Sequence, residues 1–154
     1  MTVILSIKPK YFDLIALGDK TCEIRRKFTH NADKILFYVS APVKKVMGEC
    51  DCVTSQFNLN FDSSISVFLA VHEVKRRKDG TKYNHCLSKK ELREYLYNSS
   101  EVWSIYINNF KKYDIPKDLK EYGVNRAPQN YCYFGRKPID ARRLTRVMQI
   151  TKGW

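Results

Sequence analysis

Lys20, Glu23 and Arg25 form the first group of residues in this sequence whose types and spacing suit chemistry. Residues two positions apart in a strand point to the same face, so Glu23 and Arg25 project together, with Lys20 at the strand's start. A lysine beside a carboxylate in a partly desolvated cleft can donate a proton or, with a depressed pKa, act as a base or nucleophile. The same residues can instead hold a phosphate or a nucleobase, with Arg25 forming two hydrogen bonds. An ordinary ion pair on a solvated face is the third interpretation.

Further polar candidates lie at neighbouring strand ends. Lys8 ends the first expected strand, where it either joins a basic cleft mouth or is an ordinary strand-end lysine. Ser40 ends another strand and can offer a hydroxyl to a ligand. Glu49 lies on a third strand, and a buried carboxylate there needs a cationic partner, for which Arg25 or Arg26 is expected.

Metal and cofactor chemistry is not indicated. His30, His72 and His85 are scattered, without a partner at metal-ligand spacing, so structural or surface roles are expected. Five cysteines cannot all pair, and Cys50 and Cys52 on one strand face are interpreted as small hydrophobic residues. The sequence has no Gly-rich phosphate loop, G-x-S-x-G or H-E-x-x-H. We therefore predict no metal and no cofactor.

Charge points to a polyanionic partner. The 154 residues contain 28 Lys plus Arg against 16 Asp plus Glu, a formal net charge of +12. Two basic clusters are candidates for contacting RNA phosphates: residues 75–78, which include Arg76 and Arg77, and the segment after Gly135, which includes Arg142 and Arg143. Aromatic residues near the second cluster can stack on unpaired bases. Binding of this kind is strongly salt-dependent.

The chain is the length of a single domain, and we expect residues 1–154 to form one, with 135–154 as a basic C-terminal extension. No run approaches the roughly 18 apolar residues of a membrane span, and the N-terminus is too short and too alternating for a signal peptide. The expectation is a soluble cytoplasmic protein with no membrane partner. The oligomeric state is left open.

Short strands and short helices must position the candidate residues. Strands are expected over 3–8, 20–28, 34–40, 45–53, 102–110 and 130–134. One helix is expected from Pro9 to Gly18, and another over 89–97, capped by Ser88. Residues 64–78 fit either a helix or a strand, and the helix is favoured. Residues 56–64 are expected to form a loop and 111–119 an irregular segment. This pattern lacks regular βαβ alternation and predicts an α+β fold, most simply a small barrel with short helices packed at its openings.

Three blocks of the sequence together resemble the ASCH family, a branch of the PUA-like barrel superfamily. They are Ile4-Leu5-Ser6-Ile7-Lys8-Pro9 with the later Gly18-Asp19-Lys20-Thr21-x-Glu23-x-Arg25-Arg26, then Tyr38-Val39-Ser40-Ala41-Pro42-Val43 with Val46-x-Gly48-Glu49, and Arg126-Ala127-Pro128-Gln129-Asn130-Tyr131-Cys132-Tyr133. The resemblance covers residues 2 to about 134. It implies a PUA-like β-barrel of five to six strands with a central cleft, associated with RNA metabolism.

The resemblance also implies site residues. The family includes RNA-binding modules, a ribonuclease and an amidohydrolase acting on acetylcytidine. Compared with the amidohydrolase, this chain has Lys20 at the position of the catalytic lysine, Arg25 at that of the motif arginine and Glu91 at that of the catalytic glutamate. Glu23 occupies the position where the amidohydrolase has a catalytic threonine. The expected ligand-binding residues are Lys8, Lys20, Thr21, Glu23, Arg25, Arg26, Ser40, Glu49, Arg76, Arg77, Arg142 and Arg143.

Three functions follow from these observations. The leading hypothesis is an RNA-binding domain that recognises a nucleotide in a basic cleft. The second is an enzyme on the same scaffold, a ribonuclease or a deacylase of a modified nucleoside, in which Lys20 works with Glu23 or Glu91. The third is a regulatory factor that binds an acidic partner protein through an exposed apolar patch.

Overall fold

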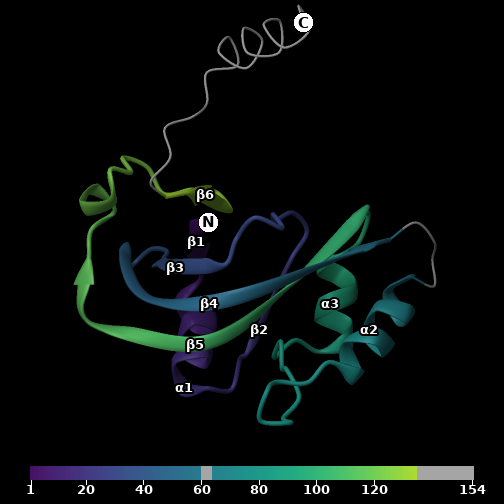
Figure 1. The fold of residues 1–154 in the computed structure, drawn as a ribbon. Coiled ribbons are helices and arrows are strands. Elements are labelled where there is room, and N and C mark those ends of the chain that lie inside the picture. Colours follow the sequence, from purple (N-terminus) through teal and green to yellow (C-terminus); the bar gives the residue numbers. More distant parts are fainter. Residues whose placement is uncertain (60–63, 135–154) are drawn as a thin grey trace, which may run out of the picture.

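The computed structural model describes residues 1–59 and 64–134, which form a mixed β-sheet and three α-helices (Figure 1). In chain order the elements are β1 (Thr2–Ile7), α1 (Pro9–Leu17), β2 (Cys22–Arg25), β3 (Lys34–Val39), β4 (Lys45–Asn58), α2 (Ser64–Val74), α3 (Lys89–Tyr95), β5 (Glu101–Lys117), the 3-10 helix η1 (Leu119–Tyr122) and β6 (Tyr131–Tyr133). The α+β fold class predicted from the sequence is confirmed.

The six strands form one sheet in the order β2-β5-β4-β3-β1-β6. β1 and β3 pair in parallel, and the other neighbours pair antiparallel. The long β4 and β5 run side by side across the molecule as a curved ribbon (Figure 1). Within residues 1–59 and 64–134 no strand pairing joins β2 to β6. In its backbone hydrogen bonds the sheet is therefore open, whereas a closed barrel was expected.

Hydrogen bonds from side chains bridge the two ends of this sheet. The Asn130 amide, just before β6, donates from Nδ2 to the Lys27 carbonyl after β2 at 2.6 Å. Thr29 Oγ1 and the Tyr133 hydroxyl lie 2.9 Å apart. Arg25 Nη1 donates to Asn130 Oδ1 at 3.1 Å. We call this junction, made by Arg25, Lys27, Thr29, Asn130 and Tyr133, the seam.

Both faces of the central sheet are covered. Along β3, Ile35, Phe37 and Val39 belong to the core cluster beneath α1, whereas Leu36 and Tyr38 belong to a cluster on the opposite face. A strand buried on both sides is expected to be an uninterrupted apolar run, which this one is. A further cluster joins α2 and α3 to β2 and the first half of β5. These two helices lie together at one end of the molecule (Figure 1).

The helices begin where the sequence predicts, but α2 ends at Val74 rather than at residue 78 and α3 at Tyr95 rather than at residue 97. Pro9 occupies the first turn of α1, and Gly18 ends it in the left-handed conformation at φ +85°, which glycine adopts without steric cost. The Ser88 hydroxyl accepts a hydrogen bond from the Glu91 amide at 3.1 Å, which caps α3. The helix favoured for the ambiguous segment is confirmed as α2.

Two expectations about the strands are wrong. Residues 56–58, expected in a loop, continue β4, and residues 111–117, expected to be irregular, continue β5 to Lys117. Their polar side chains suggested loops, but antiparallel backbone pairing between β4 and β5 needs no apolar residues. Pro116 is tolerated because β2 pairs only with residues 103–106, which leaves the second half of β5 at a sheet edge.

Gly48 lies where the backbones of β4 and β5 approach closely. A Cβ atom at this position would lie 2.7 Å from the Lys111 carbonyl oxygen of β5. The β4–β5 register also shifts between Val46 and Gly48. Only glycine lets the two backbones approach this closely.

All five cysteines are free thiols. Cys22, Cys50 and Cys52 are buried in core clusters, which for Cys50 and Cys52 agrees with their interpretation as small hydrophobic residues. In the part of the chain that the structure describes, no helix is long and apolar enough to cross a membrane.

Candidate functional site

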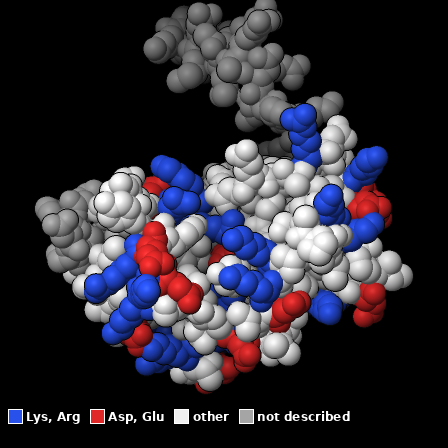
Figure 2. Space-filling view, turned by 180° about the vertical axis from the view of Figure 1, so that it is seen from behind, with Lys and Arg blue, Asp and Glu red and all other residues white. Residues whose placement is uncertain are grey.

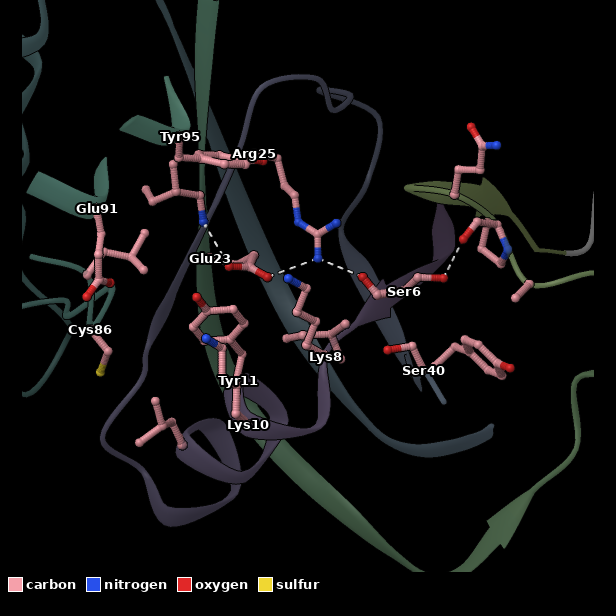
Figure 3. A pocket seen from close by; sticks show the side chains of 18 of the residues that line it. Ser6, Lys8, Lys10, Tyr11, Glu23, Arg25, Ser40, Cys86, Glu91 and Tyr95 are labelled. Atoms are coloured by element: carbon pink, nitrogen blue, oxygen red, sulfur yellow. Dashed lines mark hydrogen bonds and ion pairs between the residues drawn. The ribbon is translucent and has the colours of Figure 1, made fainter. Parts of the chain in front are cut away.

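A cleft of about 1060 Å³ opens beside β2. Its walls come from the end of β1, the first turns of α1, the outer face of α3 and residues 127–129 before β6. In Figure 3, Lys8 and Tyr11 lie across the cleft floor from Glu23 and Arg25 of β2. Lys and Arg side chains gather in the middle of the molecular face shown in Figure 2.

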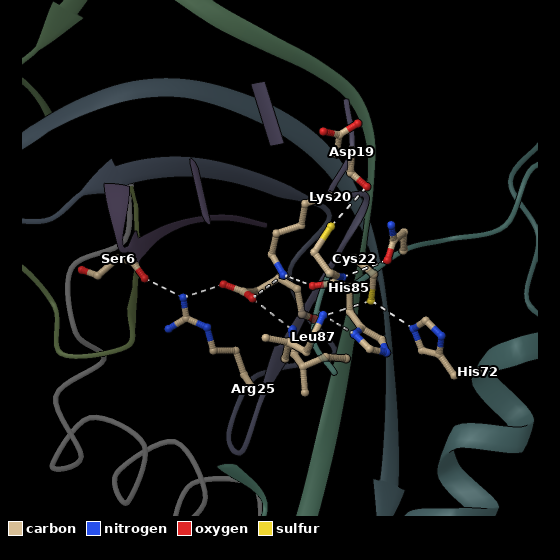
Figure 4. Close-up of polar contacts among 12 residues, drawn as sticks. Ser6, Asp19, Lys20, Cys22, Arg25, His72, His85 and Leu87 are labelled. Carbon is tan, nitrogen blue, oxygen red and sulfur yellow. Dashed lines mark hydrogen bonds and ion pairs between the residues drawn. The ribbon is translucent and has the colours of Figure 1, made fainter. Parts of the chain in front are cut away.

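A row of three charged side chains leads from the interior to the cleft wall (Figure 4). Lys20 Nζ lies 3.3 Å from Glu23 Oε1, and Arg25 Nη2 lies 3.0 Å from Glu23 Oε2. The side chains of Lys20, Glu23 and Arg25 are 0%, 8% and 16% exposed. We call these three residues the charged row. Strand alternation places Glu23 and Arg25 on one face of β2, as predicted.

The buried end of the charged row is fixed by the segment after α2. Lys20 Nζ donates to the His85 carbonyl at 2.7 Å and lies 5.2 Å from the centre of the Tyr11 ring. The ammonium therefore has a carbonyl, a carboxylate and an aromatic face around it, which compensates for its loss of hydration.

The exposed end is fixed by main chain and by the seam. Arg25 Nη2 donates to the Ser6 carbonyl at 2.7 Å, in addition to its contact with Glu23. The Ser6 hydroxyl donates to the Pro128 carbonyl at 2.6 Å. The guanidinium is thus held by β1 on one side and by Asn130 on the other, and its plane is set before any ligand arrives.

The carboxyl group of Glu23 is ionised in this setting. Burial alone would raise its pKa, but the charges of Arg25 and then Lys20, together with their hydrogen bonds, hold the pKa below its ordinary value of 4.5. With two cations and one anion, the charged row carries a net charge of +1 at neutral pH. This balance favours an electron-rich or anionic ligand in the cleft.

The opposite face of β2 carries a different polar cluster. Cys22 Sγ lies 3.4 Å from His72 Nε2, and the rings of His72 and His85 are 5.0 Å apart. Burial raises the pKa of the Cys22 thiol and lowers the pKa of His72 to about 4. Both groups are therefore neutral at pH 7, unlike the thiolate of a nucleophilic cysteine. We call Cys22, His72 and His85 the neutral cluster.

Metal ligation has no support in residues 1–59 and 64–134, where no group of three or more His, Cys, Asp or Glu side chains is arranged to hold an ion.

Five of the residues singled out in the sequence line the cleft. They are Lys8, Glu23, Arg25, Ser40 and Glu91. They come from four separate segments of the chain, which the fold brings to one cavity.

Three others do not line the cleft itself. Lys20 is fully buried behind Glu23 and borders a smaller hollow of about 280 Å³ at the end of α1. Thr21 Oγ1 accepts a hydrogen bond from the Asn84 amide at 2.9 Å, which is a structural role. The Arg26 guanidinium lies 4.9 Å from the centre of the ring of Tyr95, which does line the cleft.

The remaining expected residues lie elsewhere. Glu49 pairs with Lys34 on the adjacent strand rather than with Arg25 or Arg26, so that expected ion pair is wrong. Cross-strand register explains the difference, because Glu49 lies opposite Leu36 on β3, two residues from Lys34. Arg76 and Arg77 lie just after α2, and Arg142 and Arg143 lie outside the described residues.

Several residues at or beside the cleft were not singled out from the sequence. The Ser6 carbonyl and the Asn130 side chain hold Arg25, and Tyr11 and Tyr95 contribute rings to the cleft walls. Asn130 falls inside the third block of the family resemblance, so the sequence did mark this position. Its hydrogen bond to Arg25 could not be predicted, because the two residues lie 105 positions apart in the chain.

Helix α2 exposes apolar side chains of the kind expected of a protein-binding factor. Val67, Val71 and Val74 follow one another at helical spacing on α2 and are about half or more exposed.

Comparison with known proteins identifies related sequences and folds. The family model of the ASCH domain matches residues 5–122. The crystal structure of ASCH from Zymomonas mobilis superposes with a TM-score of 0.65 at 19% identity and covers 96% of this chain and 94% of that chain. The structure of a single-residue mutant of the same protein superposes with a TM-score of 0.65 at 17% identity, and the match covers 97% of this chain and 95% of that chain. At this identity the likeness concerns the fold.

Two curated proteins of Ureaplasma parvum match part of the chain. ATP synthase subunit alpha is 28% identical over 101 residues, and the large ribosomal subunit protein uL22 is 27% identical over 100 residues. The matches cover 66% and 65% of this chain but only 11% and 28% of those proteins. The chain thus corresponds to a minor part of each.

Proposed function

The chain belongs to the ASCH domain family, a PUA-like fold implicated in RNA binding, and from this premise we propose that it binds RNA by taking one unpaired nucleotide into the cleft beside Glu23 and Arg25. The observation that carries the proposal is the charged row. An ionised carboxylate and an immobilised guanidinium stand side by side on the cleft wall, backed by Lys20.

These two groups complement the edge of a nucleobase. The Glu23 carboxylate accepts hydrogen bonds from base N–H groups, and the Arg25 guanidinium donates to ring nitrogens or carbonyl oxygens. Tyr11 and Tyr95 add aromatic surface to the walls, which suits base stacking. The cavity volume is of the order that accommodates a small-molecule ligand, about 300 to 1000 Å³.

The ligand is an unpaired rather than a paired nucleotide. Bases in an A-form duplex present their edges in a major groove too deep and narrow for side chains to read, whereas unpaired bases can turn outward into a pocket. The formal charge of +12 then supplies sequence-independent attraction to phosphates.

Fluorescence anisotropy with labelled single-stranded RNA at two salt concentrations tests the proposal. We expect submicromolar binding that weakens as salt rises. The Arg25→Lys variant, which keeps the positive charge but not the planar guanidinium with its paired N–H donors, should bind RNA roughly tenfold more weakly. Lys112→Gln, on the exposed second half of β5, is the control. Micromolar or weaker binding that does not respond to salt would refute RNA binding.

A hydrolase acting on a modified nucleoside is a second candidate, because Glu91 and Glu94 of α3 line the cleft together with the ionised Glu23. One carboxylate can accept a proton from water while another group donates to the leaving group. A metal-free preparation incubated with RNA and with acetylcytidine tests this. Turnover no greater than that of Glu91→Gln and Lys20→Ala variants would end the enzyme hypothesis.

A further inference from the structure

A short basic hairpin follows α2. Arg76 and Lys82 pair across it, the Arg77 amide donates to the Thr81 carbonyl at 2.7 Å, and Gly80 turns the chain at φ +85°. The basic hairpin, as we call residues 75–82, contains Lys75, Arg76, Arg77, Lys78 and Lys82.

The acidic side chains of this region are already engaged. Glu73 forms an ion pair with Lys82, and one Asp79 carboxylate oxygen accepts from the Thr81 amide at 2.9 Å and the Thr81 hydroxyl at 2.6 Å. Among the ion pairs of the described residues, none involves the other four cations of the hairpin. Ion pairs within the described residues therefore leave these four charges available, and the acidic group near Arg77 is Asp79.

Several of these cations are held in place. Lys75 Nζ lies 5.3 Å from the centre of the Tyr106 ring, and the Arg77 guanidinium lies 6.0 Å from that of Tyr83. Arg76 Nη1 donates to the Glu73 carbonyl at 2.6 Å. Because the two tyrosines are buried, they act as fixed supports. Side chains that are positioned beforehand lose less conformational entropy on binding.

The basic hairpin is close to the cleft. Cys86 lines the cleft and lies only five residues after Thr81, so their Cα atoms are at most about 17 Å apart. The segment between them is anchored, because the Asn84 carbonyl accepts hydrogen bonds from the Thr21 and Cys22 amides at 2.8 and 3.1 Å. Figure 1 shows this loop, between α2 and α3, beside β2.

We propose that the basic hairpin binds the phosphodiester backbone of the same RNA whose unpaired nucleotide occupies the cleft. The ligand is accordingly a polymer of several nucleotides rather than a free nucleoside. This inference rests on the proposed function and adds a second contact to it. The hairpin contributes affinity without base preference, because phosphate contacts carry no sequence information.

The composition of the surface favours RNA over an acidic protein. Residues 75–82 contain no apolar side chain, whereas the centres of protein–protein interfaces are depleted in charged residues and built on aromatic and aliphatic anchors. A segment that carries several Lys and Arg side chains and no apolar side chain of its own is typical of contacts to phosphates.

Three double variants that each remove two positive charges test the inference. Arg76→Gln with Lys78→Gln alters the basic hairpin, Lys8→Gln with Lys10→Gln alters the cleft mouth, and Lys111→Gln with Lys112→Gln is the matched control on β5. All six side chains are exposed, and thermal unfolding checks that each variant folds. Anisotropy is measured with RNAs of 4 and 20 nucleotides across a salt series.

The hairpin variant should bind the 20-nucleotide RNA roughly tenfold more weakly, with a salt slope smaller by about 1.4 for two lost contacts to a single strand. It should bind the 4-nucleotide RNA like the wild type. Arg76→Lys with Lys78→Arg, which keeps both charges, should restore long-RNA binding. The control variant should resemble the wild type with both RNAs.

Two results would overturn the inference and leave the proposed function standing. One is a hairpin variant equal to the control on long RNA while the cleft variant is weakened on both RNAs. The other is a poly-glutamate peptide that binds as tightly as RNA and loses as much in the hairpin variant, which would indicate an acidic protein partner for this surface. Absence of salt-dependent RNA binding in the wild-type protein would remove both proposals.

Discussion

The two faces of β2 bury polar side chains in opposite ways. On one face the charged row keeps all three of its charges, because each charge has an opposite charge within hydrogen-bonding reach. On the other face, the described residues place no opposite charge within hydrogen-bonding reach of Cys22 or His72, and burial holds both in their uncharged forms. Local pairing, rather than burial, decides the charge state.

The difference also separates function from packing. Buried ion pairs seldom stabilise a protein more than apolar residues of the same size would. The charged row reaches the cleft wall, where its chemistry can serve a ligand. Cys22 belongs instead to the core cluster that joins β2 to α2 and α3, and its thiol acts there as a small apolar group.

The largest effect should come from removing the central charge of the charged row. Glu23→Gln leaves Lys20 and Arg25 as buried cations without their anion, so we expect the free energy of unfolding to fall by about 3 to 5 kcal/mol in urea titrations. Glu23→Asp, which keeps the charge, should lose less. If Glu23→Gln lowers the free energy of unfolding by less than about 1 kcal/mol, the charged row is well solvated and the contrast between the two faces of β2 does not hold.

On acidification, the neutral cluster should lose its contribution to stability at a higher pH than the charged row does. The pKa of His72 is about 4 in the folded protein and ordinarily 6.5, so below pH 6.5 the unfolded chain binds more protons. The stability contributed by His72 is complete above that pH and declines as pH falls toward 4, by about 3 kcal/mol. Burial also lowers the pKa of His85, which acts in the same direction.

The charged row responds to acid in a lower window. Because the folded pKa of Glu23 lies below its ordinary value of 4.5, its contribution persists above that pH and is lost only as pH falls further. Urea titrations from pH 7 to 3 should show a shallower decline between about pH 6.5 and 4 in His72→Gln, whereas the decline due to Glu23 should remain as pH falls below 4.5. An identical decline in the variant and the wild type throughout would contradict this assignment.

A smaller effect is expected at the seam. Asn130→Ala removes hydrogen bonds to Arg25 and to the Lys27 carbonyl, which should lower the free energy of unfolding by about 1 to 2 kcal/mol. Because Arg25 also loses a positioning contact, RNA affinity should fall more than in the matched variant Asn109→Ala on β5. Equal affinity in the two variants would show that the seam does not position Arg25.

The smallest effect concerns thiol reactivity and leaves stability unchanged. Cys22, Cys50 and Cys52 are buried, whereas Cys86 and Cys132 are partly exposed. A thiol-reactive dye should label two cysteines in the native protein and all five after denaturation. Labelling of Cys22 in the native state, detected by mass spectrometry, would show that the neutral cluster opens to solvent.

Local patterns predicted much of the fold. Alternation and capping residues located β1, α1, β3 and α3, and the same-face placement of Glu23 and Arg25 followed from strand periodicity. The ends of β4 and β5 were not predicted, because those residues are held in strands by pairing with each other rather than by burial of their side chains. Barrel closure was expected both from the pattern of short strands and helices and from the family resemblance, and backbone pairing among the described residues does not supply it.

The candidate site was predictable only where its residues are close in sequence. Lys20, Glu23 and Arg25 lie within six positions and were recognised together. Their partners Ser6, His85 and Asn130 are distant in the chain, so nothing in local sequence indicated these contacts. The partner of Glu49 was missed for the same reason, since strand register depends on the whole sheet.

The seam joins the two ends of the open sheet through hydrogen bonds made by side chains. Thr29, Asn130 and Tyr133 hold β6 and the segment after β2 together, and among the described residues no ladder of backbone pairs does so. Exchanging these side chains would loosen or strengthen the junction while every strand kept its pairing within the sheet. The junction of the two sheet ends can therefore vary in sequence more freely than the strand pairs themselves.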